Sequence, residues 1–150
     1  MYEIIPYKRE YRDDLLFCLL SAKDALGKVP TINEDLLDIQ RNYIDNNDMF
    51  WIAVDGNKRV VGMLGTKTDS PTDLWLKRFY IKPELKCMGI GSALLSKAEK
   101  FAKQRGIETI HTRFSDDYVE AAVFYPSKGF IEHDKSDGLT HLIKTVQNSM

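Results

Sequence analysis

The segment from Lys86 to Ser92 has the composition in this chain best suited to binding a ligand. It reads Lys-Cys-Met-Gly-Ile-Gly-Ser and lies between an apolar run ending at Ile81 and a run with helical periodicity. The first N–H groups of a helix have no partner within the helix and carry a partial positive charge, so they attract phosphate. Glycine at positions 89 and 91 lacks the Cβ atom that would hold a pyrophosphate away from the backbone. The segment therefore predicts a phosphate-binding loop.

Other interpretations of this loop depend on what accompanies its glycines. A dinucleotide-binding turn needs a third glycine where this chain has Leu94, and too few residues follow for the remaining strand–helix crossovers. A P-loop needs Gly-Lys followed by Ser or Thr, which the sequence lacks. A tight strand-to-helix turn that binds nothing would carry the same glycines, and the loop alone does not exclude it.

Hydrophobic periodicity indicates the elements that must position this loop. Apolar runs predict strands over residues 2–5, 50–54, 60–68, 74–81, 107–114, 130–133 and 139–146. Helical spacing and capping residues predict four helices. The first runs from Asp13 or Asp14 to Gly27, the second starts at Asn33, and the third covers residues 92–105. The fourth is capped by Asp116 and Asp117 and ends at Pro126. The order predicts an α/β domain with a central mixed, twisted sheet and helices on both faces.

Composition and charge narrow the class of protein. The 150 residues predict one domain over 1–150, and 43% hydrophobic with 29% charged residues excludes a disordered chain. A net charge of -1 argues against nucleic acid as the main partner. Two cysteines are too few for a disulfide scaffold or a four-ligand zinc site, and no metal site is expected. Without an 18-residue apolar run or a secretory leader, we expect a cytoplasmic protein that does not enter membranes.

A second motif follows the loop, Ala121-Ala122-Val123-Phe124-Tyr125-Pro126-Ser127-Lys128-Gly129-Phe130. With the strand and the glycine loop, it resembles the GCN5-related N-acetyltransferase (GNAT) superfamily. That superfamily carries Gln/Arg-x-x-Gly-x-Gly/Ala after a strand and later Asn-x-x-Ala-x-x-Phe-Tyr-x-x-x-Gly-Phe. The element order matches the GNAT fold over essentially the whole chain. The resemblance implies acetyl-CoA as the cofactor, CoA as a product, and an amine as the acceptor.

The resemblance also implies which residues hold acetyl-CoA. A strand splayed from its neighbour would pair its backbone with the pantetheine arm through Phe79, Tyr80 and Ile81. The pyrophosphate would lie on the loop formed by Lys86, Cys87, Met88, Gly89, Ile90, Gly91 and Ser92. Ala121 and Phe124 would line the thioester end. The charged pair Lys77-Arg78 inside an apolar run fits the family's bulge in this strand, and a charged sheet edge explains it equally well.

Tyr125 matches the general acid that many GNAT enzymes use. Its hydroxyl would protonate the departing CoA thiolate, while a backbone N–H, such as that of Ile81, polarises the thioester carbonyl. The alternative is that Tyr125 is an aromatic residue at a helix end that packs beneath Phe130.

The chain departs from the family pattern at two positions, and it leaves the general base open. Lys86 stands where Gln or Arg is usual; it keeps the positive charge of Arg but lacks the planar guanidinium group. Tyr118 stands where Asn is common. The amine must lose a proton before it attacks, and Asp73, His111 or a chain of waters would take that proton.

The function expected from the resemblance is transfer of an acetyl group to a primary amine of a small molecule or peptide, directly within a ternary complex. One alternative is a non-catalytic acyl-CoA-binding sensor or interaction module. Another is an acetyltransferase for protein lysines or N-termini. Family habit also makes a homodimer plausible. The sequence does not identify the acceptor.

Overall fold

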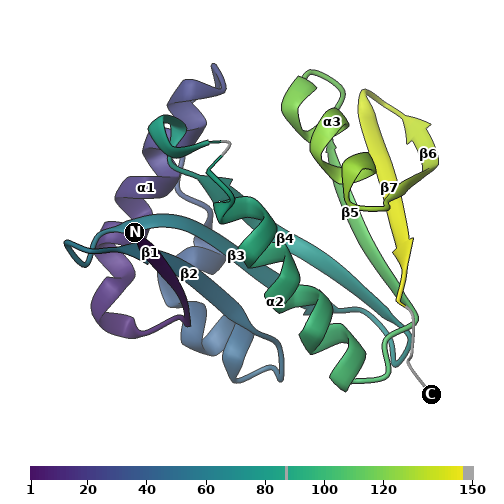
Figure 1. The fold of residues 1–150 in the computed structure, drawn as a ribbon, viewed down its shortest axis with the longest axis horizontal. Helices are drawn as coiled ribbons and strands as arrows, with labels where there is room; N and C mark the ends of the chain where they lie inside the picture. The colour runs from purple at the N-terminus through teal and green to yellow at the C-terminus, as the bar shows by residue number, and fades with distance from the viewer. Residues whose placement is uncertain (87, 147–150) are drawn as a thin grey trace. The chain divides into compact units, whose positions relative to one another are not determined.

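The computed structural model describes residues 1–86 and 88–146, and its chain forms two compact units (Figure 1). The first unit comprises residues 1–67 and 77–98. The second comprises residues 68–76 and those from Glu99 onward. Strand β4 (Asp73–Ile81) and helix α2 (Ile90–Gln104) each contribute residues to both units.

Antiparallel strands form the sheet of the first unit. Strand β2 (Phe50–Asp55) lies between β1 (Tyr2–Pro6) and β3 (Val60–Thr68), and the second part of β4 follows β3. The remaining elements of this unit are helix α1 (Arg12–Ala25), the start of α2, and the short helices η1 (Arg9–Tyr11), η2 (Glu34–Asp38), η3 (Gln40–Ile44) and η4 (Pro83–Leu85). η3 is a π-helix and the other short helices are 3-10 turns.

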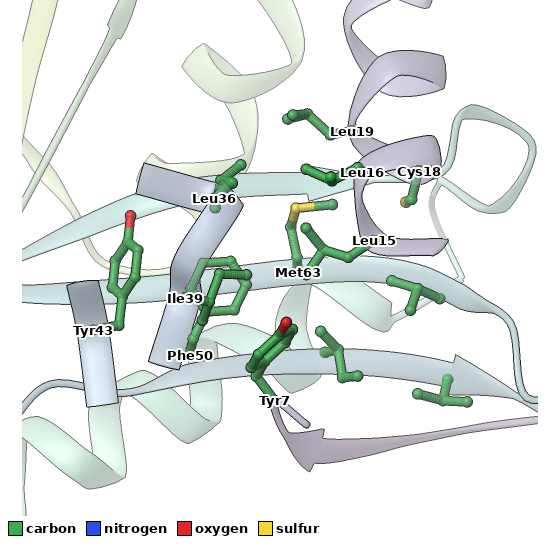
Figure 2. Packing of buried hydrophobic residues seen from close by; sticks show 13 residues of the cluster. Tyr7, Leu15, Leu16, Cys18, Leu19, Leu36, Ile39, Tyr43, Phe50 and Met63 are labelled. Atoms are coloured by element: carbon green, nitrogen blue, oxygen red, sulfur yellow. The ribbon is translucent and has the colours of Figure 1, made fainter. Parts of the chain in front are cut away.

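Alternation along β3 puts helices on both faces of this unit's sheet. Met63 is fully buried in a cluster with residues of α1, η2 and η3, including Leu15 and Leu36 (Figure 2). The preceding residue, Gly62, faces α2, because a Cβ atom there would lie 3.0 Å from Cγ2 of Ile90. The absence of a side chain at Gly62 therefore lets α2 pack closely on β3.

The second unit has a mixed sheet. Strand β5 (Thr109–Ser115) is parallel to β4, while β7 (Leu139–Thr145) is antiparallel to both β5 and β6 (Ile131–Ser136). Helix α3 (Val119–Ser127) packs on one face, where Tyr125 stacks on Phe114 of β5. With β4 shared by the units, the hydrogen-bonded order is β1-β2-β3-β4-β5-β7-β6.

The predicted α/β class and mixed sheet are confirmed, and the strand predicted over 60–68 has those bounds. The helix predicted from Asn33 is instead two short pieces, η2 and η3. Helix α2 starts at Ile90 rather than Ser92. No helix of residues 1–86 and 88–146 has the length and apolar character needed to cross a bilayer.

The predicted caps of the last helix were wrong. Helix α3 begins at Val119 after Tyr118, with no side-chain cap, so neither Asp116 nor Asp117 caps it. The carboxylate of Asp116 instead accepts a hydrogen bond from Thr140 on β7. The helix also runs one residue beyond Pro126. Proline removes a single backbone donor and disturbs little so close to a helix end.

Candidate functional site

The glycine loop joins the end of β4 to the start of α2 within the first unit. The backbone N–H of Lys82 donates to the carbonyl of Val61 at 2.8 Å, which ties the exit of β4 to β3. The N–H of Ala93 bonds the carbonyl of Gly89 at 3.0 Å, the first i to i−4 bond at the start of α2. The amides of the preceding turn, from Ile90 to Ser92, are therefore those that a helix leaves for capping groups or an anion.

The backbone of this loop explains one of its two glycines. Gly89 has φ +84°, a left-handed conformation that residues with a side chain rarely adopt. Ile90 is 2% exposed and its side chain faces Gly62 of β3, so this residue offers a ligand only its backbone. Met88 is exposed, Gly91 is buried and Ser92 is half-buried. Cys87, also predicted to contact the pyrophosphate, lies outside the described residues.

The pleat of β4 is interrupted at Arg78, just before the segment predicted to bind pantetheine. Arg78 has φ +55°, and a left-handed residue inside a strand is typical of a β-bulge. Its guanidinium forms two hydrogen bonds to the carboxylate of Asp35, at 3.0 and 2.9 Å. The hydroxyl of Tyr43 donates to the same carboxylate. The structure thus favours the bulge over a merely charged edge, and it shows what holds the bulge.

Asp35 is ionised in this arrangement. Burial alone would raise the pKa of Asp35, but the hydrogen bonds from Arg78 and Tyr43 outweigh that effect and hold the pKa below its ordinary value. The ion pair is about one-third exposed, with side-chain exposures of 32% and 27%. It links η2 to β4 at the residue that precedes Phe79.

We expect Asp35→Asn to lower the free energy of unfolding by about 1 kcal/mol near neutral pH, a small value because solvent screens the pair. A carboxyl group whose pKa is lowered by folding stabilises the protein above its unfolded pKa, and the effect is lost as the pH falls. The difference between wild type and variant should therefore be complete at pH 7 and shrink below about pH 4. Urea unfolding at pH 7 and pH 3 measures it. Asp38→Asn, at an exposed residue of the same helix η2, is the control, and an equal loss at both pH values would contradict the prediction.

Tyr125 lies in the second unit, in a pocket of aromatic rings. Its side chain is 7% exposed, and its ring meets those of Phe114, Phe124 and Phe130 at centroid distances of 5.6, 5.4 and 5.3 Å. Burial raises the pKa of Tyr125 to about 12, although its hydrogen bond with Thr112 acts in the opposite direction. The hydroxyl is therefore protonated at neutral pH, as a proton donor must be. The packing against Phe130 that the sequence also allowed is present.

The other residues predicted at the thioester end lie on the same helix. Ala121 and Phe124 are half-buried on α3. Tyr118, where the family pattern has Asn, is the residue before α3 and is also half-buried. The described residues contain no group of three or more His, Cys, Asp or Glu side chains able to hold a metal ion.

The second unit contains a chain of hydrogen-bonded side chains that the sequence did not predict. Nε2 of His111 lies 2.7 Å from Oδ1 of Asp73, and Nδ1 of His111 lies 2.9 Å from Nε2 of His141. Trp75 stacks on both imidazoles, at 4.7 and 4.9 Å. The sequence suggested Asp73 and His111 as separate candidates for a base, but the structure connects them and adds His141.

The model of the acetyltransferase (GNAT) family matches residues 12–130, which include both the glycine loop and the Phe-Tyr motif. The chain belongs to the GNAT family. The probable N-acetyltransferase camello of Xenopus tropicalis is 31% identical over 103 residues, and human N-acetyltransferase 8 is 29% identical over 106. These matches cover 66% and 67% of this chain and 46% of each relative. The chain thus spans about half the length of the curated relatives it matches.

Solved structures confirm the GNAT fold. A GNAT-family acetyltransferase of Staphylococcus aureus Mu50 superposes with a TM-score of 0.86 at 24% identity, covering 98% of this chain and 100% of that one. The PaiA N-acetyltransferase of Thermoplasma acidophilum, solved with coenzyme A, has a TM-score of 0.80 at 22% identity, over 97% and 99% of the chains.

The GNAT motif residues fall into two groups. The first unit brings the end of β4, with Phe79, Tyr80 and Ile81, into one connection with the described loop residues Lys86 and 88–92. The second unit holds Ala121, Phe124 and Tyr125 on α3.

Proposed function

We propose that this chain is a single acetyl-CoA-dependent N-acetyltransferase domain that acetylates a primary amine of a small molecule or peptide. The observation that carries the proposal is the GNAT family match, which spans both sequence motifs. The geometry adds support, because each motif has a backbone or an ionisation state suited to its role. The location in the cytoplasm and a homodimer remain predictions from sequence.

The cofactor would be held mainly by backbone. The amides of the loop and of the first turn of α2 suit a pyrophosphate, and Lys86 adds a positive charge beside them. The strand residues Phe79, Tyr80 and Ile81 would pair with the pantetheine arm.

The acetyl group would pass directly from acetyl-CoA to the amine. The neutral amine would attack the thioester carbonyl, the C–S bond would break, and the CoA thiolate would take a proton from the hydroxyl of Tyr125. The nitrogen would then lose its extra proton to give the amide, and that proton would restore the hydroxyl of Tyr125. Holding amine and thioester together supplies much of the rate, since it replaces an encounter in solution. A backbone N–H directed at the carbonyl oxygen, with Ile81 as the candidate, stabilises the charge that develops there.

Thermal melting with acetyl-CoA, CoA and NAD tests the cofactor. At a hundredfold excess over the dissociation constant, a ligand of the native state adds about 2.7 kcal/mol, which raises the Tm by several degrees. We expect both CoA species, but not NAD, to raise the Tm. A thiol-release assay with a panel of amines then separates an enzyme from an acyl-CoA sensor. No shift with either CoA species would contradict the proposal.

A further inference from the structure

The three histidines of the chain gather on one face of the second unit's sheet. His111 on β5 is paired with Trp75 on β4, and Arg113, two residues further, is paired with His141 on β7. Residues two apart on a strand share a face, so these side chains stand together. His133 of β6 approaches His141 edge-on, with ring centroids 4.7 Å apart. Neither the cofactor loop nor Tyr125 accounts for this arrangement.

A fixed acceptor anchors one end of the set. Oδ2 of Asp73 accepts hydrogen bonds from the hydroxyls of Thr72 and Ser70, at 2.6 and 3.0 Å, while Oδ1 faces Nε2 of His111 at 2.7 Å. The hydrogen bonds from Thr72 and then His111 lower the pKa of Asp73, so the carboxylate is ionised at neutral pH. An ionised carboxylate only accepts hydrogen bonds.

That acceptor assigns the tautomers of both imidazoles. Nε2 of His111 must carry a proton to donate to Asp73, so in the neutral ring Nδ1 is an acceptor. Nε2 of His141, 2.9 Å away, must then carry the proton shared between the rings. In neutral His141 this leaves Nδ1 with a lone pair. The chain of hydrogen bonds therefore ends in a proton acceptor.

We infer that Asp73, His111 and His141 form a proton relay that takes the proton which the acceptor amine loses before it attacks acetyl-CoA. This inference rests on the proposed function and adds the base that the sequence left open. The ammonium proton passes to Nδ1 of His141, and the proton on Nε2 of His141 moves to Nδ1 of His111. The product is a neutral amine, a neutral His141 and an imidazolium at His111 paired with the carboxylate of Asp73.

The surrounding charges favour this direction. Burial, followed by His111, His133 and Arg113, lowers the pKa of His141, and Asp134 of β6 acts more weakly in the opposite sense. The protonated form of His141 therefore loses its proton more readily than an ordinary histidine does. On His111 the proton lies beside the carboxylate of Asp73. The proton accordingly moves inward, from the half-exposed His141 toward Asp73.

The relay and the proposed acid would work from opposite sides of one strand. Thr112, the hydrogen-bond partner of Tyr125, directly follows His111 on β5. Successive side chains of a strand point to opposite faces. The acid and the base would therefore approach the thioester carbon, which bonds both the amine nitrogen and the sulfur during transfer, from opposite faces of the sheet.

The pH dependence of kcat/KM tests the relay, with a lysyl peptide, a peptide with a free α-amino group and propylamine as acceptors. The variants are Asp73→Asn, His111→Gln and His141→Gln, with His133→Gln as the control in the same cluster but outside the chain of hydrogen bonds. We expect the two relay histidine variants to lose about a hundredfold in rate, together with the acidic limb of the profile. Asp73→Asn should move that limb to lower pH, because the imidazolium loses its partner. His133→Gln should keep the wild-type rate above the acidic limb and move that limb at most slightly to higher pH, because His133 is one of the weaker influences that lower the pKa of His141.

A second measurement does not depend on activity. Long-range ¹H–¹⁵N NMR spectra should show that His111 and His141 both carry their proton on Nε2 when the rings are neutral. Asp73→Asn should remove the preference of His111 for this tautomer. Protonation of His141 at Nδ1, or an unchanged acidic limb in His111→Gln, would overturn the relay. Failure of the wild type to melt higher with acetyl-CoA would instead overturn the proposed function. Retained acetyl-CoA shifts in the variants show that a rate loss is not a folding defect.

Discussion

Replacing Tyr125 by phenylalanine is expected to lower kcat by at least about a hundredfold and to leave acetyl-CoA binding unchanged. The variant removes the hydroxyl that would protonate the CoA thiolate, and positioned acids of this kind contribute about 10²–10⁴ in rate. The three ring contacts of Tyr125 need no hydroxyl, so the pocket should keep its shape. Stopped assays of CoA release give kcat, and the Tm shift with acetyl-CoA reports binding.

Thr112→Val is the matched control for this substitution. It removes the same hydrogen bond but leaves the tyrosine hydroxyl in place. Both variants should lose about 1 kcal/mol of stability, since each breaks one buried hydrogen bond. Only Tyr125→Phe should lose the large factor in kcat. Equal rates in the two variants would reduce Tyr125 to a packing residue. Because the pKa of Tyr125 is raised to about 12, its ionisation should not produce a basic limb below about pH 10.

The parts of the site that are local in sequence could be predicted from it. The glycine loop follows a strand and precedes a helix, and the left-handed φ of Gly89 shows the physical need for one of its glycines. Tyr125 is part of a continuous motif on one short helix. In such segments the spacing of residues already implies their geometry.

The proton relay could not be predicted, because strand pairing alone creates it. Asp73 is 38 residues from His111, and His111 is 30 residues from His141. Sequence shows only that His111 and His141 lie in predicted strands and that Asp73 directly precedes another. Without knowing that β4 and β7 both flank β5, three separate polar residues give no reason to expect a chain of hydrogen bonds.

Hydrogen bonds to backbone carbonyls that do not follow the α-helical pattern explain why no regular helix forms from Asn33. Of the apolar residues in this segment, Leu36 and Tyr43 are buried, whereas Leu37 is 43% exposed. The side chain of Asn42 donates to the carbonyl of Asp35, and the N–H of Asp45 bonds the carbonyl of Gln40, five residues back. These bonds replace a regular helix by a 3-10 turn and a π turn. The same arrangement lets the Asp35 carboxylate reach Arg78.

A negative charge at Ser92 should have opposite effects on cofactor affinity and on stability. Ser92 is the third residue of α2, where a carboxylate interacts favourably with the helix dipole and adds about 0.3–1 kcal/mol of stability. At the same place it would repel a pyrophosphate bound to the first turn. Ser92→Glu is therefore expected to weaken acetyl-CoA binding tenfold or more, about 1.4 kcal/mol, while the Tm of the free protein stays equal or rises.

Ser92→Gln separates charge from size, because it has the same length and no charge. We expect the affinity difference between the Glu and Gln variants to shrink as ionic strength rises, since salt screens the repulsion. Isothermal titration with acetyl-CoA at 0.05 and 0.5 M NaCl measures it. Dissociation constants that are equal for the two variants at low salt would mean that no anion lies at the start of α2. A loop that is only a strand-to-helix turn would show the gain in stability without any cost in affinity, and the two measurements together tell these cases apart.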